Sequence, residues 1–473
     1  MTRNIIKADL AIIGAGAGGL SVASGAAQLG ARVVLFEHGE MGGDCLNYGC
    51  VPSKALIAAA GAAAAARASG RLGVEASGGS IDFSAVMAHV RETIAAIAPH
   101  DSQERFEGLG VRVIREAARF ADAKTLYSPT ATVRARRIII ATGSRPRVPD
   151  IEGLGEVPFL TNETVFSLAR LPERLVVLGG GPIGLELGQA FRRLGSEVVI
   201  VEPGVPMSRE DPEAAALVVE QLRLDGVDLK VGCRVKRVES GPVVVLQTPT
   251  GEERVSGTHL LLAVGRAPSI EGLDLEVGGV AFDERGIKTD DSLRTSNPRV
   301  YAIGDVAGRG QFTHLAGAHA GLLVRRLLFA MPIDAAKLVV PRATYTSPEV
   351  ATVGLTEAEA RAAHGDDIRV EKVAFRGNDR ALAEGDIRGF GKLVTDRKGR
   401  ILGATLVGAH AGEQIQLWTL AMGAGVKLSQ IAGMIAPYPT RGEINKRMAG
   451  QWFTPTLFSP MSRLAVAILK RWA

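Results

Sequence analysis

Short runs of apolar residues recur along the chain, and the first of them leads into a glycine-rich turn. The run Ala8–Ile13 precedes GAGAGG, small residues continue over Leu20–Leu29, and a second apolar run, Val33–Phe36, ends at Glu37. Apolar runs this short are typical of buried parallel strands, whereas the longer stretch of small residues is typical of a helix. The pattern predicts a strand, a turn, a helix and a second strand. The glycines of the turn are Gly14, Gly16 and Gly19.

This order of elements gives the glycines a chemical meaning. Glycines spaced as G-x-G-x-x-G let backbone N–H groups at a helix N-terminus approach a pyrophosphate. An acid at the end of the second strand, here Glu37, accepts hydrogen bonds from a ribose diol. The N-terminal segment therefore predicts a dinucleotide-binding fold.

The same arrangement appears a second time. Its strands are Leu175–Leu178 and Val198–Val201, its helix runs to Leu194, and its acid is Glu202. We therefore expect the chain to bind two dinucleotides. An acid at Glu202 favours the free 2′-hydroxyl of NADH, and Arg209, close by in the sequence, keeps NADPH as the alternative. The glycines of the second turn are Gly179, Gly181 and Gly184.

Composition limits the class of protein. With 473 residues, 46% of them hydrophobic, the chain is long enough for two to four folded domains. The net charge of +5 comes without a sustained basic tract, so no nucleic-acid partner is expected. We also expect no membrane-spanning helix and no signal peptide, because the apolar runs are short and the N-terminus enters a strand directly. Three cysteines in a long chain favour a reducing, cytoplasmic compartment over a secreted disulfide scaffold.

Two cysteines follow the first dinucleotide motif, in the sequence GGDCLNYGCVPSKAL. Cys50 opens a predicted helix that runs through Pro52 and Lys54, and Cys45 precedes it by five positions. The partial positive charge at a helix N-terminus favours the thiolate, which is the form that exchanges disulfides. The pair is therefore predicted to be redox-active, whereas Cys233 lies in a strand-like stretch and is expected to be structural.

The cysteine segment resembles the redox-active disulfide of the flavin-dependent pyridine nucleotide–disulfide oxidoreductases, and the resemblance continues to about residue 450. It implies that Cys45 is the interchange thiol that meets the substrate and that Cys50 lies beside the flavin. It further implies that Lys54 lies near flavin N5, paired with Glu186 from the helix of the second motif. The disulfide follows the first motif, so that motif is expected to hold FAD and the second the nicotinamide.

Two further segments resemble FAD-binding motifs of this family. The segment RIIIATGS resembles the strand that completes the first part of the FAD-binding domain. The segment VYAIGDV resembles the second FAD signature, and the resemblance implies that its acid binds the ribityl chain. A helix that begins near Thr313 would direct its N-terminus to the flavin O2 side. The additional residues expected at a cofactor are Ala141, Thr142, Gly143, Gly265, Asp305, Thr313 and Ala316.

The resemblance implies an α/β protein with two Rossmann-like dinucleotide-binding domains, for FAD and NAD, and a C-terminal α+β dimerisation domain. The FAD domain is expected to be discontinuous, over residues 1–150 and 265–335, with the NAD(P) domain inserted at 151–264. The dimerisation domain is expected over 340–450, followed by a tail, 451–473, and the enzyme is expected to be a homodimer.

The chain departs from the family at the C-terminal His-Pro-Thr-x-x-Glu motif, which here reads Tyr-Pro-Thr-Arg-Gly-Glu. Tyr438 replaces the histidine that serves as acid–base catalyst for the interchange thiol, while Glu443 keeps its place. Tyrosine titrates near about pH 10 and histidine near about 6.5, so roughly one tyrosine in a thousand is ionised at neutral pH. Glu443 is either a catalytic partner or a structural acid.

The expected function is electron transfer from NADH through FAD and the Cys45–Cys50 disulfide to a small-molecule acceptor. Because Tyr438 is a poor base, we expect a quinone, a metal ion or an unusual disulfide. The alternatives are a dihydrolipoamide dehydrogenase, a mercuric reductase-like enzyme and a non-catalytic flavin redox sensor. Mercuric reductases also carry a tyrosine at this position, but they use a C-terminal cysteine pair, and this sequence has no cysteine after Cys233. No resident metal site is predicted.

The tail Leu457–Trp472 reads LFSPMSRLAVAILKRW and has helical periodicity. Leu464, Ile468 and Trp472 share one helical face, and the bases surround another. A packing helix or a frayed terminus is the preferred interpretation, and a membrane-surface anchor is the alternative. The bases are Arg463, Lys470 and Arg471.

Overall fold

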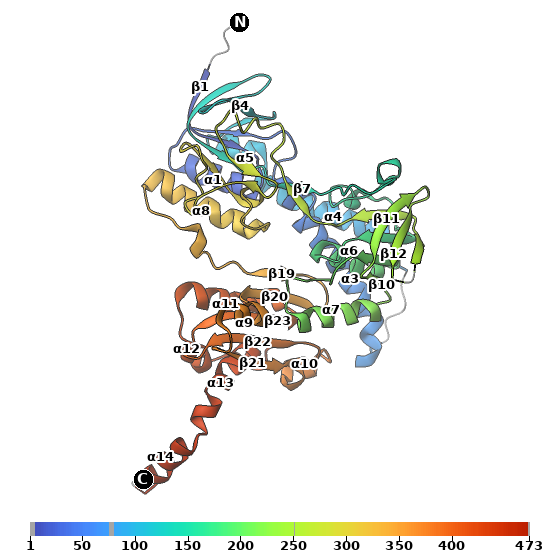
Figure 1. Ribbon diagram of the computed structural model, residues 1–473, viewed down its shortest axis with the longest axis vertical. Helices are drawn as coiled ribbons and strands as arrows, with labels where there is room; N and C mark the ends of the chain where they lie inside the picture. Colours follow the sequence, from blue (N-terminus) through green and yellow to red (C-terminus); the bar gives the residue numbers. More distant parts are fainter. Residues whose placement is uncertain (1–4, 75–79, 250, 472–473) are drawn as a thin grey trace. The chain divides into compact units, whose positions relative to one another are not determined.

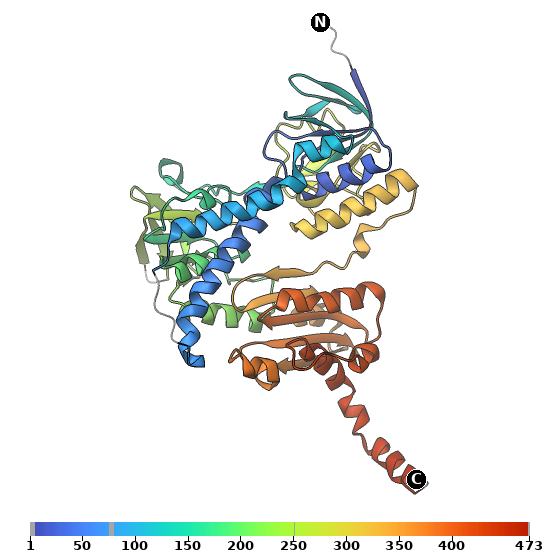
Figure 2. The same cartoon turned by 180° about the vertical axis from the view of Figure 1, so that it is seen from behind.

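The computed structural model describes residues 5–74, 80–249 and 251–471. These residues fold as two compact units, Met1–Pro203 with Val227–Leu338, and Gly204–Gly226 with Val339–Ala473. Figures 1 and 2 show the ribbon from two sides. Each unit is built around its own sheets and its own apolar core.

The first unit contains the predicted N-terminal dinucleotide fold. Its strands β1, β2, β3, β6 and β18 run parallel, and β4 and β5 complete the sheet in the antiparallel sense. Helix α1 packs against α8. The elements are β1 (Ile5–Ile13), α1 (Ala17–Gln28), β2 (Val33–Phe36), β3 (Arg112–Ile114), β4 (Arg119–Asp122), β5 (Thr125–Tyr127), β6 (Thr132–Ile140), β18 (Val300–Ala302) and α8 (Thr313–Phe329).

A second parallel sheet in the same unit repeats this design. It has the order β10-β9-β8-β14. Helix α6 follows β8, the first of these strands in the chain, as α1 follows β1. A three-stranded antiparallel sheet, β11 to β13, is packed beside it around one shared core. The elements are β8 (Arg174–Leu178), α6 (Pro182–Leu194), β9 (Glu197–Glu202), β10 (Asp228–Val231), β11 (Arg234–Glu239), β12 (Val243–Thr248), β13 (Gly251–Ser256) and β14 (His259–Leu262). Cys233 is buried between β10 and β11 and belongs to no strand.

The cysteine segment forms α2 (Gly43–Asn47) and α3 (Cys50–Ala68), and α3 packs against α4 (Phe83–Ile97) and α6. The helix predicted to open at Cys50 is confirmed and continues through an Ala-rich stretch to Ala68. Among the described residues, the segment Gly43–Leu72 is long and apolar enough to cross a membrane by length and composition alone. Alanines interrupted by few charges give this segment a mean hydropathy of 1.3, and α3 within it packs against α4 and α6, as a core helix does.

The second unit is centred on a five-stranded antiparallel sheet of order β19-β20-β23-β22-β21. Trp418 of α11 is fully buried in its core, and its indole N–H donates to Asn445 Oδ1 of α13 at 2.7 Å. The elements are β19 (Arg342–Thr344), β20 (Glu349–Gly354), α9 (Glu357–His364), β21 (Ile368–Ala374), α10 (Asp379–Ala383), β22 (Phe390–Asp396), β23 (Ile401–Gly408), α11 (Ala411–Ala424), α12 (Leu428–Gly433), α13 (Glu443–Leu457) and α14 (Pro460–Leu469). The predicted fold class, α/β with a C-terminal α+β domain, is confirmed.

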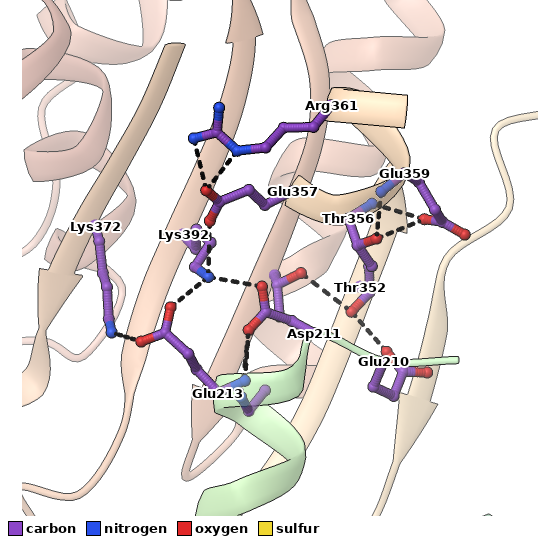
Figure 3. A network of polar contacts seen from close by, with 12 residues as sticks. Glu210, Asp211, Glu213, Thr352, Thr356, Glu357, Glu359, Arg361, Lys372 and Lys392 are labelled. Carbon is purple, nitrogen blue, oxygen red and sulfur yellow. Dashed lines mark hydrogen bonds and ion pairs between the residues drawn. The ribbon is translucent and has the colours of Figure 1, made fainter. Parts of the chain in front are cut away.

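Helix α7 (Pro212–Leu224) belongs to this second unit, although its sequence lies between the strands β9 and β10 of the first. Lys392 of β22 attaches it: the ammonium lies 2.7 Å from Asp211 Oδ2 and 2.6 Å from Glu213 Oε1. Glu357 is a third carboxylate, at 3.1 Å (Figure 3). Burial opposes the charged form of Lys392, but these carboxylates together raise its pKa. Segment 204–226 thus belongs to the second compact unit, whereas its sequence lies within the NAD(P) domain expected over 151–264.

The C-terminal helix α14 forms where helical periodicity is predicted. Ser459 caps it by accepting the Ser462 N–H, and Pro460 occupies its first turn. None of its residues is buried, so α14 does not pack against the rest of the described chain, and of the preferred interpretations an exposed terminus stays open beside the membrane-surface anchor. Trp472, expected on its apolar face, lies outside the described residues.

Candidate active site

Two helix N-termini converge on Cys50. Cys50 is the first residue of α3, and its sulfur lies 3.4 Å from the hydroxyl of Thr313, the first residue of α8. Cys45 lies in α2, behind a turn in which Gly42 and Gly43 take positive φ of 89° and 62°. The unpaired N–H groups and partial positive charge of both helix starts favour a negative charge at Cys50. The sequence predicts the helix start at Cys50 but not the contact with Thr313.

The two thiols have opposite acidities. The pKa of Cys50 falls to about 6, chiefly because Cys45 hydrogen-bonds to its thiolate, with further contributions from Thr313 and the charge of Lys54 against the cost of burial. The pKa of Cys45 rises, because the same hydrogen bond, burial and the neighbouring negative charge all favour its protonated form. The reduced pair therefore carries one thiolate near neutral pH, on Cys50.

Lys54 and Glu186 meet as the resemblance implies. Lys54 lies one helical turn beyond Cys50, and its ammonium donates to Glu186 Oε2 at 2.8 Å. The Glu186 side chain is buried on α6, and the Lys54 side chain is partly exposed. This pair therefore connects the helix of the second glycine motif to the helix that carries Cys50.

The loop before Cys45 is held by an arginine that sequence reasoning missed. Arg266 Nη2 lies 3.1 Å from Asp44 Oδ1, and its Nε donates to Ser144 Oγ at 2.7 Å. Ser144 in turn donates to Asp305 Oδ2 at 2.5 Å, and Asn162 donates to Asp44 at 2.9 Å. The signal available in the sequence is an arginine directly after a buried strand and Gly265, in LLLAVGRAP.

Asp305 occupies a buried turn after β18. Burial raises the pKa of its carboxyl, against the hydrogen bond from Ser144 and the charge of Arg266. The preceding residue, Gly304, donates its N–H to Nδ1 of His319 on α8 at 3.3 Å. Burial, with the charge of Arg309, lowers the pKa of His319 to about 4, so this histidine is neutral and serves as an acceptor.

The first glycine turn fits a dinucleotide. A Cβ at Gly14 would collide with Ala141 O, and one at Gly19 would collide with Gly14 O, so both positions require glycine for close packing. A Cβ at Gly16 would meet no atom within 4 Å, so the start of α1 is accessible to a pyrophosphate. Glu37 Oε2 accepts the Ala15 N–H at 2.6 Å and so lies beside the turn.

The second turn reproduces this geometry. A Cβ at Gly179 would collide with Ala263 O, and a Cβ at Gly184 would collide with Gly179 O. A Cβ at Gly181 would meet no atom within 4 Å. Glu202 Oε2 accepts the Gly180 N–H at 2.7 Å, the counterpart of the bond to Glu37. Of the remaining expected cofactor residues, Thr142 donates to Ser269 O at 2.7 Å. Gly143 (φ 70°) and Gly265 (φ 109°), also expected at a cofactor, have positive φ, which glycine adopts readily and other residues rarely do.

Tyr438 and Glu443 lie in the second unit. The Tyr438 side chain is exposed, and its hydroxyl donates to Asp379 Oδ2 at 3.0 Å, which raises the pKa of Tyr438. Glu443 Oε2 accepts the Thr440 N–H at 3.3 Å at the start of α13. Glu443 thus has a local role in fixing this turn, and Tyr438 remains protonated at neutral pH.

Two family models match the chain. The pyridine nucleotide-disulphide oxidoreductase model matches residues 8–320, and the dimerisation domain model of the same family matches residues 340–449.

Individual proteins resemble the chain over nearly its whole length. A mercuric reductase of Streptomyces lividans is 38% identical over 460 residues, covering 94% of this chain and 96% of that protein. A dihydrolipoyl dehydrogenase of Bacillus subtilis is 35% identical over 456 residues, covering 94% and 96%. The Cu(II) complex of the HOCl-induced flavoprotein disulfide reductase RclA from Escherichia coli superimposes with a TM-score of 0.84 at 28% identity, covering 93% of this chain and 99% of that chain.

Proposed function

Since the chain belongs to the pyridine nucleotide-disulphide oxidoreductase family and is an FAD-dependent enzyme that uses NAD(P)H, we propose that its Cys45–Cys50 pair reduces a thiophilic metal ion. FAD, when bound, carries electrons from the nicotinamide to the cysteines. The two glycine turns, with Glu37 and Glu202, would hold the two dinucleotides. Lys54 and Glu186 would lie where the two motifs meet.

The electron balance fits such an acceptor. A hydride from NADH and one proton from solvent convert the Cys45–Cys50 disulfide into two thiol groups. Two Cu(II) ions then take two electrons and become Cu(I), the disulfide forms again, and two protons are released. A single Hg(II) ion would take both electrons. The low pKa of Cys50 supplies a thiolate near neutral pH, which is the form of cysteine that metal ions bind.

The observation that carries this proposal is the state of Tyr438. A disulfide substrate needs an acid–base group, because the thiolate that leaves must be protonated and the attacking thiol deprotonated. Tyr438 hydrogen-bonds to Asp379 and its pKa is raised, so it stays protonated near neutral pH and cannot act as the base. A metal ion accepts electrons without accepting a proton. The names of two relatives, a mercuric reductase and a reductase solved with Cu(II), agree with this choice.

Three further properties are proposed with the reaction. Glu202 beside the second turn supports NADH over NADPH, because a carboxylate repels a 2′-phosphate. The match of residues 340–449 to the dimerisation domain supports a homodimer. A cytoplasmic location remains a prediction from the cysteine content.

The test is NADH oxidation by the purified, FAD-loaded protein at neutral pH with Cu(II), Hg(II), lipoamide or a soluble quinone as acceptor. We expect metal-dependent turnover that is abolished in Cys45→Ser and Cys50→Ser and retained in Cys233→Ser, which alters only the buried third cysteine.

Other outcomes identify the alternatives. Lipoamide turnover on the order of hundreds per second, high in the usual enzyme range, would establish a dihydrolipoamide dehydrogenase. Quinone reduction that survives loss of both cysteines would mean that the flavin is the direct donor. Stoichiometric reduction without turnover on any acceptor would establish a redox sensor.

A further inference from the structure

The end of the chain carries exposed apolar side chains that belong to neither dinucleotide motif nor the family's dimerisation domain. The match to that domain stops at residue 449. Beyond it, α13 ends at Leu457 and α14 covers Pro460–Leu469, and no residue of α14 is buried. The exposed large apolar residues of this segment are Leu457, Phe458, Met461, Leu464, Val466, Ile468 and Leu469.

Helix α14 arranges these side chains on one face. Met461, Leu464 and Ile468 follow the spacing i, i+3, i+7 and therefore form one stripe. Their exposed fractions are 79%, 62% and 50%. Arg463 and Lys470, the residue directly after the helix, lie on the side away from this stripe, together with the exposed Val466. The helix is thus amphipathic, with its apolar face toward solvent.

The charge of the segment has one sign. Residues 450–471 contain no Asp or Glu and three bases. An apolar stripe with bases opposite matches a surface that is apolar beneath a layer of negative charge. The bases are Arg463, Lys470 and Arg471.

Two hydrogen bonds fix the start of the helix. Ser459 accepts the Ser462 N–H at 3.2 Å, and the Ser462 hydroxyl donates to Thr456 O at 2.9 Å. The second bond ties the start of α14 to the last turn of α13.

We propose that α14 binds the surface of a membrane that contains anionic lipids. Ten residues of helix span about 15 Å, half of the roughly 30 Å hydrocarbon core, so the helix would lie in the interface rather than cross it. A second copy of the chain is the weaker occupant. The match to the family's dimerisation domain ends at residue 449, before this stripe, and the bases of two copies would repel each other. The proposal is independent of the electron acceptor.

The test is flotation of the full-length, FAD-loaded protein with vesicles of phosphatidylcholine alone or of equimolar phosphatidylcholine and phosphatidylglycerol. We expect the protein to float with the anionic vesicles, and high salt to weaken binding. Leu464→Glu/Ile468→Glu should reduce the bound fraction at least about tenfold, because the stripe then carries charge. Arg463→Gln/Lys470→Gln should reduce it less, and only on anionic vesicles.

The matched control is Leu29→Glu, which places the same charge at a leucine that is 53% exposed in the first unit. All variants should keep the flavin spectrum and melting temperature of the wild type. Equal flotation of wild type and Leu464→Glu/Ile468→Glu, or no flotation of the wild type, would overturn the proposal. Equal binding to neutral vesicles would refute the anionic part. A smaller oligomer in Leu464→Glu/Ile468→Glu by light scattering, without vesicle binding, would instead assign the stripe to a second copy.

Discussion

Lys54 Nζ donates to Glu186 Oε2 at 2.8 Å, across 132 positions of the chain. Lys54 follows the first dinucleotide motif and Glu186 stands in the helix of the second, so one ion pair joins the halves of a duplicated design. The Glu186 side chain is buried, whereas the Lys54 side chain is partly exposed. The buried carboxylate therefore orients the Lys54 ammonium. The resemblance to the family implies that Lys54 lies near flavin N5, on the path of the hydride.

Loss of charge at either partner should slow reduction of the flavin by NADH. We expect Glu186→Gln and Lys54→Met each to slow flavin bleaching by about tenfold, which corresponds to about 1.4 kcal/mol in the barrier. The double variant should be no slower than the slower single variant, because both remove one interaction. Stopped-flow absorbance measures the rates, and Glu197→Gln, at an exposed carboxylate, serves as the control. Additive losses would show that the two residues act separately.

The Thr313 hydroxyl should set the acidity of Cys50. A hydrogen bond to a thiolate lowers the pKa, so Thr313→Val should raise the pKa of Cys50 above its value of about 6. Hydrogen bonds to charged groups contribute about 1.5–3 kcal/mol, so the shift should be on the order of one pH unit. The thiolate fraction at pH 6–7 should fall accordingly.

Alkylation of the reduced protein by iodoacetamide, followed against pH, measures this change. The midpoint should move to higher pH in Thr313→Val and stay in place in Thr93→Val, whose hydroxyl donates to the backbone within α4. An unmoved midpoint in Thr313→Val would mean that Cys45 and Lys54 alone set the acidity of Cys50.

The sequence predicts those parts of the site whose geometry is local. Both glycine turns, the acids beside them and the helix start at Cys50 depend on residues within one strand–turn–helix unit, where spacing determines position. The contact of Cys50 with Thr313 joins residues 263 positions apart, and the bond of Arg266 to Ser144 joins residues 122 apart. Such pairs depend on how separate elements pack, so the periodicity of the sequence does not predict them.

Helix α7 shows the same limit on a larger scale. Its sequence lies between β9 and β10 of the second parallel sheet, so continuity predicts that it belongs there. Lys392, whose side chain is only 4% exposed, instead recruits Asp211 and Glu213 to the sheet of the second unit. A buried ammonium must be paired with carboxylates, from any part of the chain that can reach it. The sequence does not show that Lys392 is buried, so it does not predict this pairing.

A histidine at position 438 should restore disulfide chemistry if proton transfer is what the site lacks. Tyr438→His places a group with a pKa near about 6.5 where tyrosine stays protonated. We expect NADH-dependent lipoamide reduction to rise by roughly 10²-fold, at the low end of positioned acid–base catalysis. Tyr438→Phe, which loses only the hydrogen bond to Asp379, should leave the wild-type rate within about twofold. A strong loss in Tyr438→Phe would show that the hydroxyl itself takes part in the reaction.

Removal of the charge at Lys392 should destabilise the second unit. Lys392→Met leaves Asp211 buried without the ammonium, and breaking a buried ion pair costs about 3–5 kcal/mol. Lys398→Met, at an exposed lysine on the neighbouring turn, should change the unfolding free energy by no more than about 0.5 kcal/mol. Urea unfolding followed by tryptophan fluorescence measures both variants, because Trp418 is buried in this unit.

The pH dependence of unfolding separates this ion cluster from simple packing. Hydrogen bonds from Lys372 and Lys392 lower the pKa of Glu213 from 4.5, so its contribution is complete above that value and is lost as pH falls through the folded-state pKa. Burial works against the charged form of Glu357, but hydrogen bonds from Arg361 and Lys392 lower its pKa as well. Wild-type stability should therefore decline below about pH 4.5, and Lys392→Met should show a shallower decline. Equal slopes in the two proteins would mean that Lys392 stabilises α7 through its aliphatic chain alone.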